Sequence, residues 1–173
     1  MLVADAKRSA VSAAGKHQHE AASGFHHLLV PIAPGEEVNG ALAVACALAS
    51  ERGATVRAIA VVEIPAELPF DAHMFEEEAA ARRHLLQARE VGESHGVTVE
   101  IEIVRGRSAG EAIVAESTRD GTELIVLRKE RRRRPGRRIL FGSTVDHVLN
   151  HAPCPVMVVA PRDERARPLS TVV

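Results

Sequence analysis

The sequence contains no tryptophan and no tyrosine, and its four phenylalanines make up an aromatic content of 2%. Proteins that bind single-stranded nucleic acid without sequence preference stack bases on aromatic side chains, so this scarcity argues against such a platform. Apolar content is nevertheless 46%. The core must therefore be built from valine, leucine, isoleucine and alanine, which is the composition expected of strands covered by helices on both faces.

Cysteines and long apolar runs are also scarce. Cys46 and Cys154 stand in apolar surroundings without the spacing of metal ligands, which predicts buried free thiols in a reducing compartment. No apolar run approaches the roughly 20 residues of a membrane span. No hydrophobic stretch follows the basic residues near the N-terminus, so no secretion signal is expected. We expect a soluble, cytoplasmic chain without a transmembrane segment.

The hydrophobic pattern alternates between two periods along the chain. Short apolar or β-branched runs predict five strands, at 27–32, 55–62, 97–104, 124–127 and 155–159. Helical spacing of apolar residues predicts four helices, at 39–52, 71–94, 108–120 and 142–151. Asp71 and Ser108 are the expected N-caps of the second and third helices, and Glu111 would complete a capping box with Ser108. Gly53 and Gly96 are expected to end the first two helices.

Five strands alternating with four helices require parallel crossover connections. We predict an α/β fold: an open five-stranded parallel sheet, doubly wound and Rossmann-like. It would occupy residues 25–161, between a flexible leader at 1–24 and a tail at 162–173. A ligand of such a sheet lies outside the carboxyl ends of the strands, where the strand order reverses. The loops after the first and fourth strands, 33–37 and 128–141, are therefore the predicted ligand-binding segments.

The second of these loops concentrates positive charge. Residues 128–138 read RKERRRRPGRR and hold eight of the 22 basic residues and one acid. The rest of the chain then has 14 bases against 22 acids, a net charge of −8, whereas the whole chain has −1. The bases of this segment form a predicted anion-binding loop: Arg128, Lys129, Arg131, Arg132, Arg133, Arg134, Arg137 and Arg138.

Three interpretations of this arginine loop remain open. It is a solvated basic loop, or it captures nucleotide phosphates with arginine as the ligand. In the third interpretation it docks on a polyanion such as nucleic acid, anionic lipid or an acidic protein face. Eight like charges without aromatic residues favour contact with phosphates over the reading of bases.

The start of the last predicted helix, Gly142-Ser143-Thr144, offers free backbone amides to an anion. We interpret Ser143 as an N-cap and not as a nucleophile, because the sequence places no base beside it. His147 and His151 have the i, i+4 spacing of metal ligands, but two ligands do not make a site. No catalytic constellation is evident. We expect a protein that is not an enzyme and that has no metal.

Three segments together resemble the universal stress protein family, over roughly residues 26–160. They are LLVPI at 28–32, ELIVL at 123–127 and GSTVDHVLNHAPCPVMVV at 142–159. The resemblance to this UspA-like family implies an open five-stranded parallel sheet and a regulatory role in stress responses. It also implies a homodimer through the last strand, formed by Pro155, Val156, Met157, Val158 and Val159.

Family members that bind ATP share an Asp that closes the first strand and a G-x-x-G motif followed, after nine residues, by G-[ST]. Ala33 stands at the position of the Asp, and Arg128 and Arg131 stand at the two early glycines. Gly142 and Ser143 are retained, one residue further along than in the family pattern. Arginine would cost about 1 kcal/mol or more on the glycine backbone, so the loop should take another path. The resemblance thus implies weakened or lost ATP binding.

If a nucleotide is still bound, the resemblance assigns its contacts residue by residue. Pro31 and Ile32 would flank the base, and Val61 would line its pocket. Ala33, Leu127, Arg128 and Arg131 are the further candidates for nucleotide binding. Gly142, Ser143 and Thr144 would meet the phosphates. A further alternative is an anion-docking interaction module, which resembles the family domains that are appended to membrane transporters.

Overall fold

The computed structural model describes residues 24–33, 39–129 and 142–160. One parallel sheet forms the centre of the protein, with the strand order β3-β2-β1-β4-β5. Its strands are β1 (His27–Pro31), β2 (Thr55–Glu63), β3 (Val99–Gly106), β4 (Leu124–Arg128) and β5 (Val156–Val159). The helices of the described part are α3 (Asn39–Ser50), α4 (Phe75–Ser94), α5 (Ala109–Arg119) and α6 (Ser143–His151). The doubly wound parallel fold predicted from the sequence is confirmed.

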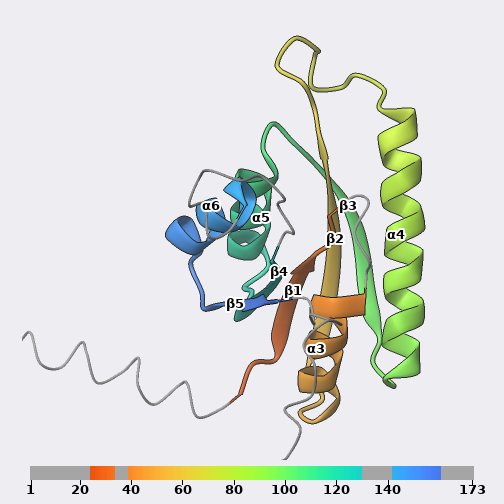
Figure 1. The fold of residues 1–173 in the computed structure, drawn as a ribbon, viewed down its shortest axis with the longest axis vertical. Helices are drawn as coiled ribbons and strands as arrows, with labels where there is room; N and C mark the ends of the chain where they lie inside the picture. Colours follow the sequence, from red (N-terminus) through yellow and green to blue (C-terminus); the bar gives the residue numbers. More distant parts are fainter. Residues whose placement is uncertain (1–23, 34–38, 130–141, 161–173) are drawn as a thin grey trace, which may run out of the picture.

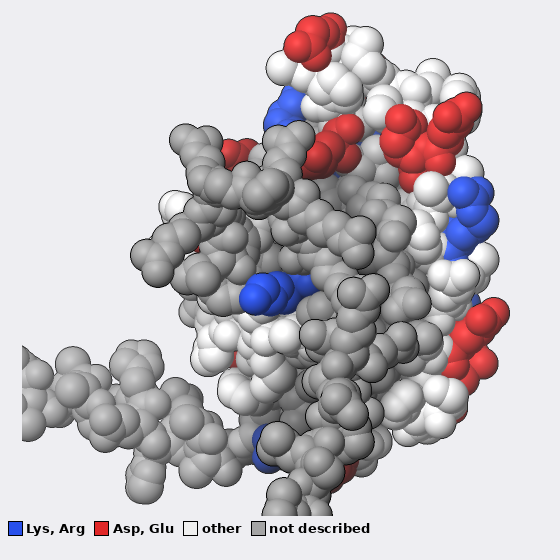
Figure 2. Space-filling model, viewed as in Figure 1, with Lys and Arg blue, Asp and Glu red and all other residues white. Residues whose placement is uncertain are grey.

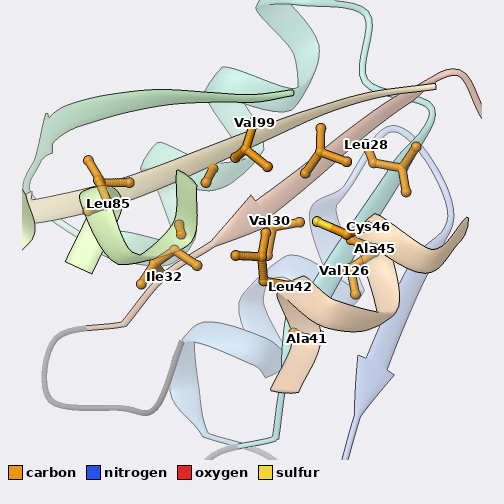
Figure 3. Close-up of a cluster of buried hydrophobic side chains, with 14 of the residues drawn as sticks. Leu28, Val30, Ile32, Ala41, Leu42, Ala45, Cys46, Leu85, Val99 and Val126 are labelled. Carbon is orange, nitrogen blue, oxygen red and sulfur yellow. The ribbon is translucent and has the colours of Figure 1, made fainter. Parts of the chain in front are cut away.

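Helices cover both faces of this sheet (Figure 1): α3 and α4 lie on one face, and α5 and α6 on the other. Successive residues of a strand point to opposite faces. In β1, Leu28 and Val30 therefore join the core cluster beneath α3 and α4, whereas Leu29 joins the cluster beneath α5 and α6. Figure 3 shows the first of these, the α3/α4 cluster, with Leu42 and Cys46 pointing at the strands. Two apolar layers thus hold the sheet in place.

The start of α4 differs from the sequence prediction. Asp71 does not cap this helix, which begins at Phe75 after Met74. Residues 65–68 and 69–72 form two turns before the helix. In the first, the Leu68 N–H donates to the Pro65 carbonyl (3.1 Å), and in the second the Ala72 N–H donates to the Pro69 carbonyl (3.0 Å). The second turn includes Asp71, so this residue is held in a turn and the helix starts only after it. The predicted end is confirmed, since Gly96 has a φ of +67° just after α4.

The caps of α5 and α6 also differ from the prediction. Ser108 is the N-cap residue of α5, but its side chain makes no capping hydrogen bond, so the capping box with Glu111 does not form. Glu63 Oε1 instead accepts a 2.6 Å hydrogen bond from the Ala109 amide. In α6 the N-cap is Gly142, and Ser143 is the first helical residue.

The two cysteines are free thiols. Cys46 is fully buried and Cys154 is half-buried, and burial raises the pKa of both. In the part of the chain that the structure describes, no helix is long and apolar enough to cross a membrane. The predicted leader and tail fall outside the described residues, apart from Gly24.

Candidate functional site

The strand order reverses between β1 and β4, which are neighbours in the sheet although α3, β2, α4, β3 and α5 separate them in the chain. Leu28 pairs with Leu124, and Leu29 with Ile125. The carboxyl ends of both strands therefore reach the same edge of the sheet, which is where ligands bind in this fold. Residues 34–38 and 130–141 lie outside the described residues, and so do all predicted contacts from Arg131 to Arg138.

The end of β1 offers little polar chemistry. Pro31 and Ala33 are half-buried, and Ile32 is buried in the α3/α4 cluster. The Ile32 amide is already used, because it donates a 2.8 Å hydrogen bond to the Ile59 carbonyl. At this position Ala33 contributes only a methyl group, so no side chain that closes β1 can hydrogen-bond a ligand.

The N-terminus of α6 has no side-chain cap. Gly142 is buried, with φ −66° and ψ 164°, and its carbonyl accepts from the Asp146 amide at 2.9 Å. Ser143 is exposed and Thr144 is half-buried. The first amides of a helix have no partner within the helix and favour an anion. The retained Gly142-Ser143-Thr144 therefore has the geometry of an anion-binding helix start.

Arg128 lies at a second helix start. It ends β4, and a Cβ placed on Gly40 would lie 3.7 Å from Arg128 Nε and 3.8 Å from its Cδ. The first turn of α3 contains no acidic residue. The Arg128 guanidinium therefore lies beside the partly positive end of α3.

The backbone of Arg128 is unstrained. It belongs to a regular strand, and no described residue other than glycine has a positive φ. The steric cost expected for arginine on a glycine backbone is therefore not incurred at this position. Arg131, at the second glycine position, lies outside the described residues.

The structure separates the predicted site residues into two groups. Val61 and Leu127 lie in the α5/α6 cluster together with Val145 of α6. Ile32 lies in the α3/α4 cluster on the opposite face. Ile32 and Val61 thus do not line one apolar pocket, although both lie near the carboxyl edge of the sheet.

Sequence reasoning missed two contributors to this edge, Gly40 and Glu63. Gly40 lies next to the Arg128 side chain, and nothing in the helical pattern of 39–52 signals that proximity. The Glu63 carboxylate reaches the start of α5. Its position at the end of a predicted strand was the available signal, since parallel strands end at the same edge.

The predicted histidine pair does not extend into a metal centre in the described part of the chain. The His147 and His151 rings stack with centroids 4.2 Å apart, and His151 Nδ1 lies 2.8 Å from the His147 carbonyl. Among the described residues, no three His, Cys, Asp or Glu side chains gather as metal ligands would.

The last strand, β5, forms one edge of the sheet, and all four of its residues are half-buried. The Pro155 carbonyl accepts from the Ile125 amide (3.1 Å) and the Val159 carbonyl from the Lys129 amide (2.8 Å). Pro155 and Val159 therefore point their backbone groups at β4. Those of Val156 and Val158 point to the outer edge, which is a template for pairing with another strand.

Comparison with known proteins gives a family match over this whole region. A sequence model described as the universal stress protein family matches residues 24–160. No curated protein matches the chain.

Several solved structures share the fold. A universal stress protein from Archaeoglobus fulgidus has a TM-score of 0.66 at 20% identity, with coverage of 78% of this chain and 98% of that one. UspA from Lactobacillus plantarum has a TM-score of 0.63 at 24% identity, with coverage of 79% and 98%. The Archaeoglobus fulgidus protein in complex with dAMP has a TM-score of 0.63 at 18% identity, with coverage of 78% and 98%.

Proposed function

Because this chain belongs to the universal stress protein family, we propose that it is a non-enzymatic regulatory domain of stress responses with weakened ATP binding. The observation that carries the proposal is Ala33, a half-buried methyl at the end of β1 where ATP-binding members have an Asp. A hydrogen bond to a charged group contributes about 1.5–3 kcal/mol. Its absence weakens binding about 10-fold to 100-fold. We further propose a cytoplasmic location, which the two free thiols favour.

The test is thermal unfolding in low salt with and without 1 mM ATP. A ligand stabilises the fold only when its concentration is comparable with its Kd or exceeds it. We expect an unchanged Tm for the wild type, and a rise of several degrees for Ala33→Asp, which restores the family's carboxylate. A clear rise for the wild type would overturn the proposal of a weakened site.

A second candidate function is nucleotide binding with arginine as the phosphate ligand. It is supported by Arg128 beside the start of α3, and by the dAMP complex of the Archaeoglobus fulgidus protein. In this case ATP or dAMP would raise the Tm of the wild type, and Arg128→Ala would abolish the rise. Arg89→Ala is the matched control, because Arg89 is an exposed arginine on α4.

A third candidate is docking of the arginine loop on a polyanion, which is favoured by eight bases within residues 128–138. Heparin binding would then depend steeply on salt. Replacement of Arg131, Arg132, Arg133 and Arg134 by alanine would abolish it. Binding that survives this replacement would exclude the loop as the docking segment.

We also propose that the protein forms a homodimer through the outer edge of β5. Val158→Pro removes an amide that points away from β4, and proline is tolerated on edge strands in that orientation. This variant should sediment as a monomer at concentrations where the wild type sediments as a dimer, with its fold retained. Met157→Pro, whose amide points at β4, should instead lower the Tm. A Val158→Pro variant that is still dimeric would place the interface elsewhere.

A further inference from the structure

The segment between β2 and α4 is held in a defined conformation by Arg105 of β3 and by Arg107, which directly follows this strand. Arg107 Nη1 donates to the carbonyls of Ile64 (3.2 Å) and Pro65. Arg105 donates to the Ala72 carbonyl and pairs with Glu78 of α4 at 3.1 Å. Together with the two proline turns described above, these contacts fix the segment before any partner binds. A preorganised surface loses less conformational entropy on binding.

This segment exposes large apolar side chains. Leu68 is 41% exposed, Phe70 is 51% exposed and Phe75, at the start of α4, is 73% exposed. Arg107 lies over one face of the Phe70 ring, 5.7 Å from its centroid, and His73 stacks on Phe75 at 5.0 Å. Two of the chain's four phenylalanines, Phe70 and Phe75, are thus exposed, and neither belongs to a core cluster.

Acidic residues surround these rings. Glu67, Asp71, Glu76 and Glu77 are exposed, while Glu78 is paired with Arg105. In Figure 2, acidic side chains gather at the upper end of the molecule, where Figure 1 places the segment between β2 and α4 and the first turns of α4. We name this surface the aromatic tip: Leu68, Phe70 and Phe75 with the four exposed acids.

We propose that the aromatic tip is a docking surface for a partner protein that presents a short cationic segment with apolar side chains. Aromatic side chains are enriched at binding hot spots, and a polar rim around them excludes water. The acidic rim selects a basic partner and favours its association. An anionic membrane would be repelled by the same four carboxylates. The tip lies at the end of β2, so this inference does not depend on the proposed function of the β1–β4 edge.

The test uses the full chain and a fluorescently labelled synthetic peptide of lysine and leucine, in which the leucines are spaced to lie on one face of a helix. Binding of the peptide is measured by fluorescence anisotropy. We expect saturable binding that weakens with salt. The double substitution of Phe70→Ser and Phe75→Ser should weaken it at least about tenfold, the effect of losing a hot-spot pair. Glu76→Gln with Glu77→Gln should weaken it several-fold at low salt only. Leu149→Ser is the matched control, because Leu149 is 42% exposed on α6, and it should bind like the wild type.

Several outcomes would overturn the proposal. One is a Phe70→Ser, Phe75→Ser variant with a wild-type Tm and undiminished peptide binding. Another is equally tight binding of a glycine–lysine peptide, which would show that charge alone suffices. A third is self-association of the wild-type chain that the Phe70→Ser, Phe75→Ser variant lacks, which would assign the tip to a second copy of the chain. Binding to phosphatidylcholine vesicles that the same variant loses would assign it to a membrane.

Discussion

At the scale of single residues, Gly92 shows how closely α4 approaches β3. A Cβ at this position would lie 2.3 Å from Val99 Cγ2 and 2.7 Å from the Val97 carbonyl oxygen. Real Cβ atoms do not come so close to a backbone oxygen, so the helix would have to move away from the strand. Gly92 is therefore a packing requirement of the helix–sheet interface and not a weakness in the helix.

Gly92→Ala should consequently lower the free energy of unfolding by about 1–3 kcal/mol, the usual cost of overpacking. In an isolated helix the same change would stabilise by roughly 0.5–1 kcal/mol, so the sign of the effect reports the contact. Urea unfolding measures it. Glu93→Ala on the exposed neighbour is the control, with an expected change within about 0.5 kcal/mol. A stabilised Gly92→Ala variant would contradict the close approach.

At the scale of elements, the start of α5 depends on a residue from another strand. The Ala109 amide donates to Glu63, which lies at the end of β2. The carboxylate satisfies one of the unpaired amides of the helix and its negative charge suits the helix dipole. The two elements are therefore coupled, and the first turn of α5 should loosen when this contact is lost.

Glu63→Ala should lower the free energy of unfolding by about 1 kcal/mol, which is typical of a lost N-cap. Amide hydrogen exchange should quicken in the first turn of α5 and stay unchanged in α4. Glu51→Ala, another exposed glutamate, is the control. If exchange quickened equally across all helices, the contact would not be acting as a local cap.

At the scale of the whole molecule, two carboxylates link stability to pH. Hydrogen bonding from Arg57 lowers the pKa of Glu102, and the backbone amides of His26 and His27 lower the pKa of Glu123. Arg57 also contacts Glu116 of α5 and Asp120, the C-cap of that helix, so Glu102 belongs to a cluster that joins β2, β3 and α5. Glu123 joins the start of β4 to that of β1. Both carboxylates therefore tie separate elements together.

A carboxyl group whose folded pKa is depressed binds its proton more readily in the unfolded chain. Its stabilising contribution is present above the unfolded pKa, near 4.3, and is lost as the pH falls through the folded pKa. The Tm should accordingly decrease as the pH is lowered below about 4.5. A Glu102→Gln, Glu123→Gln variant should start from a lower Tm at pH 7 and show a shallower fall. Glu93→Gln serves as the control and should follow the wild-type curve. A variant profile as steep as that of the wild type would show that other groups govern the acid transition.

Local patterns predicted the elements well where local chemistry decides them. An uninterrupted apolar run such as Leu124–Leu127 can bury all of its side chains only as a strand in a sheet that is covered on both faces. The caps at Asp71 and Ser108 were predicted from the same local rules. Asp71 is not the N-cap of α4, and Ser108 is the N-cap residue of α5 but makes no capping hydrogen bond. The segment around Asp71 is held by Arg105 and Arg107, and α5 is capped by Glu63, some 46 residues away in the chain. Contacts of that range leave no periodic signal in the sequence.

The same division holds for the candidate site. By itself, the sequence determined the alternating elements, the parallel sheet and its switch point, and the missing carboxylate at Ala33. These follow from hydrophobic periodicity and residue identity, which act along the chain. Only the tertiary structure decided that Arg128 lies beside the start of α3, that Ile32 and Val61 face opposite sides of the sheet, and that Phe70 and Phe75 stand exposed among acids. Those relations depend on how distant segments pack, because burial and proximity are properties of the folded chain.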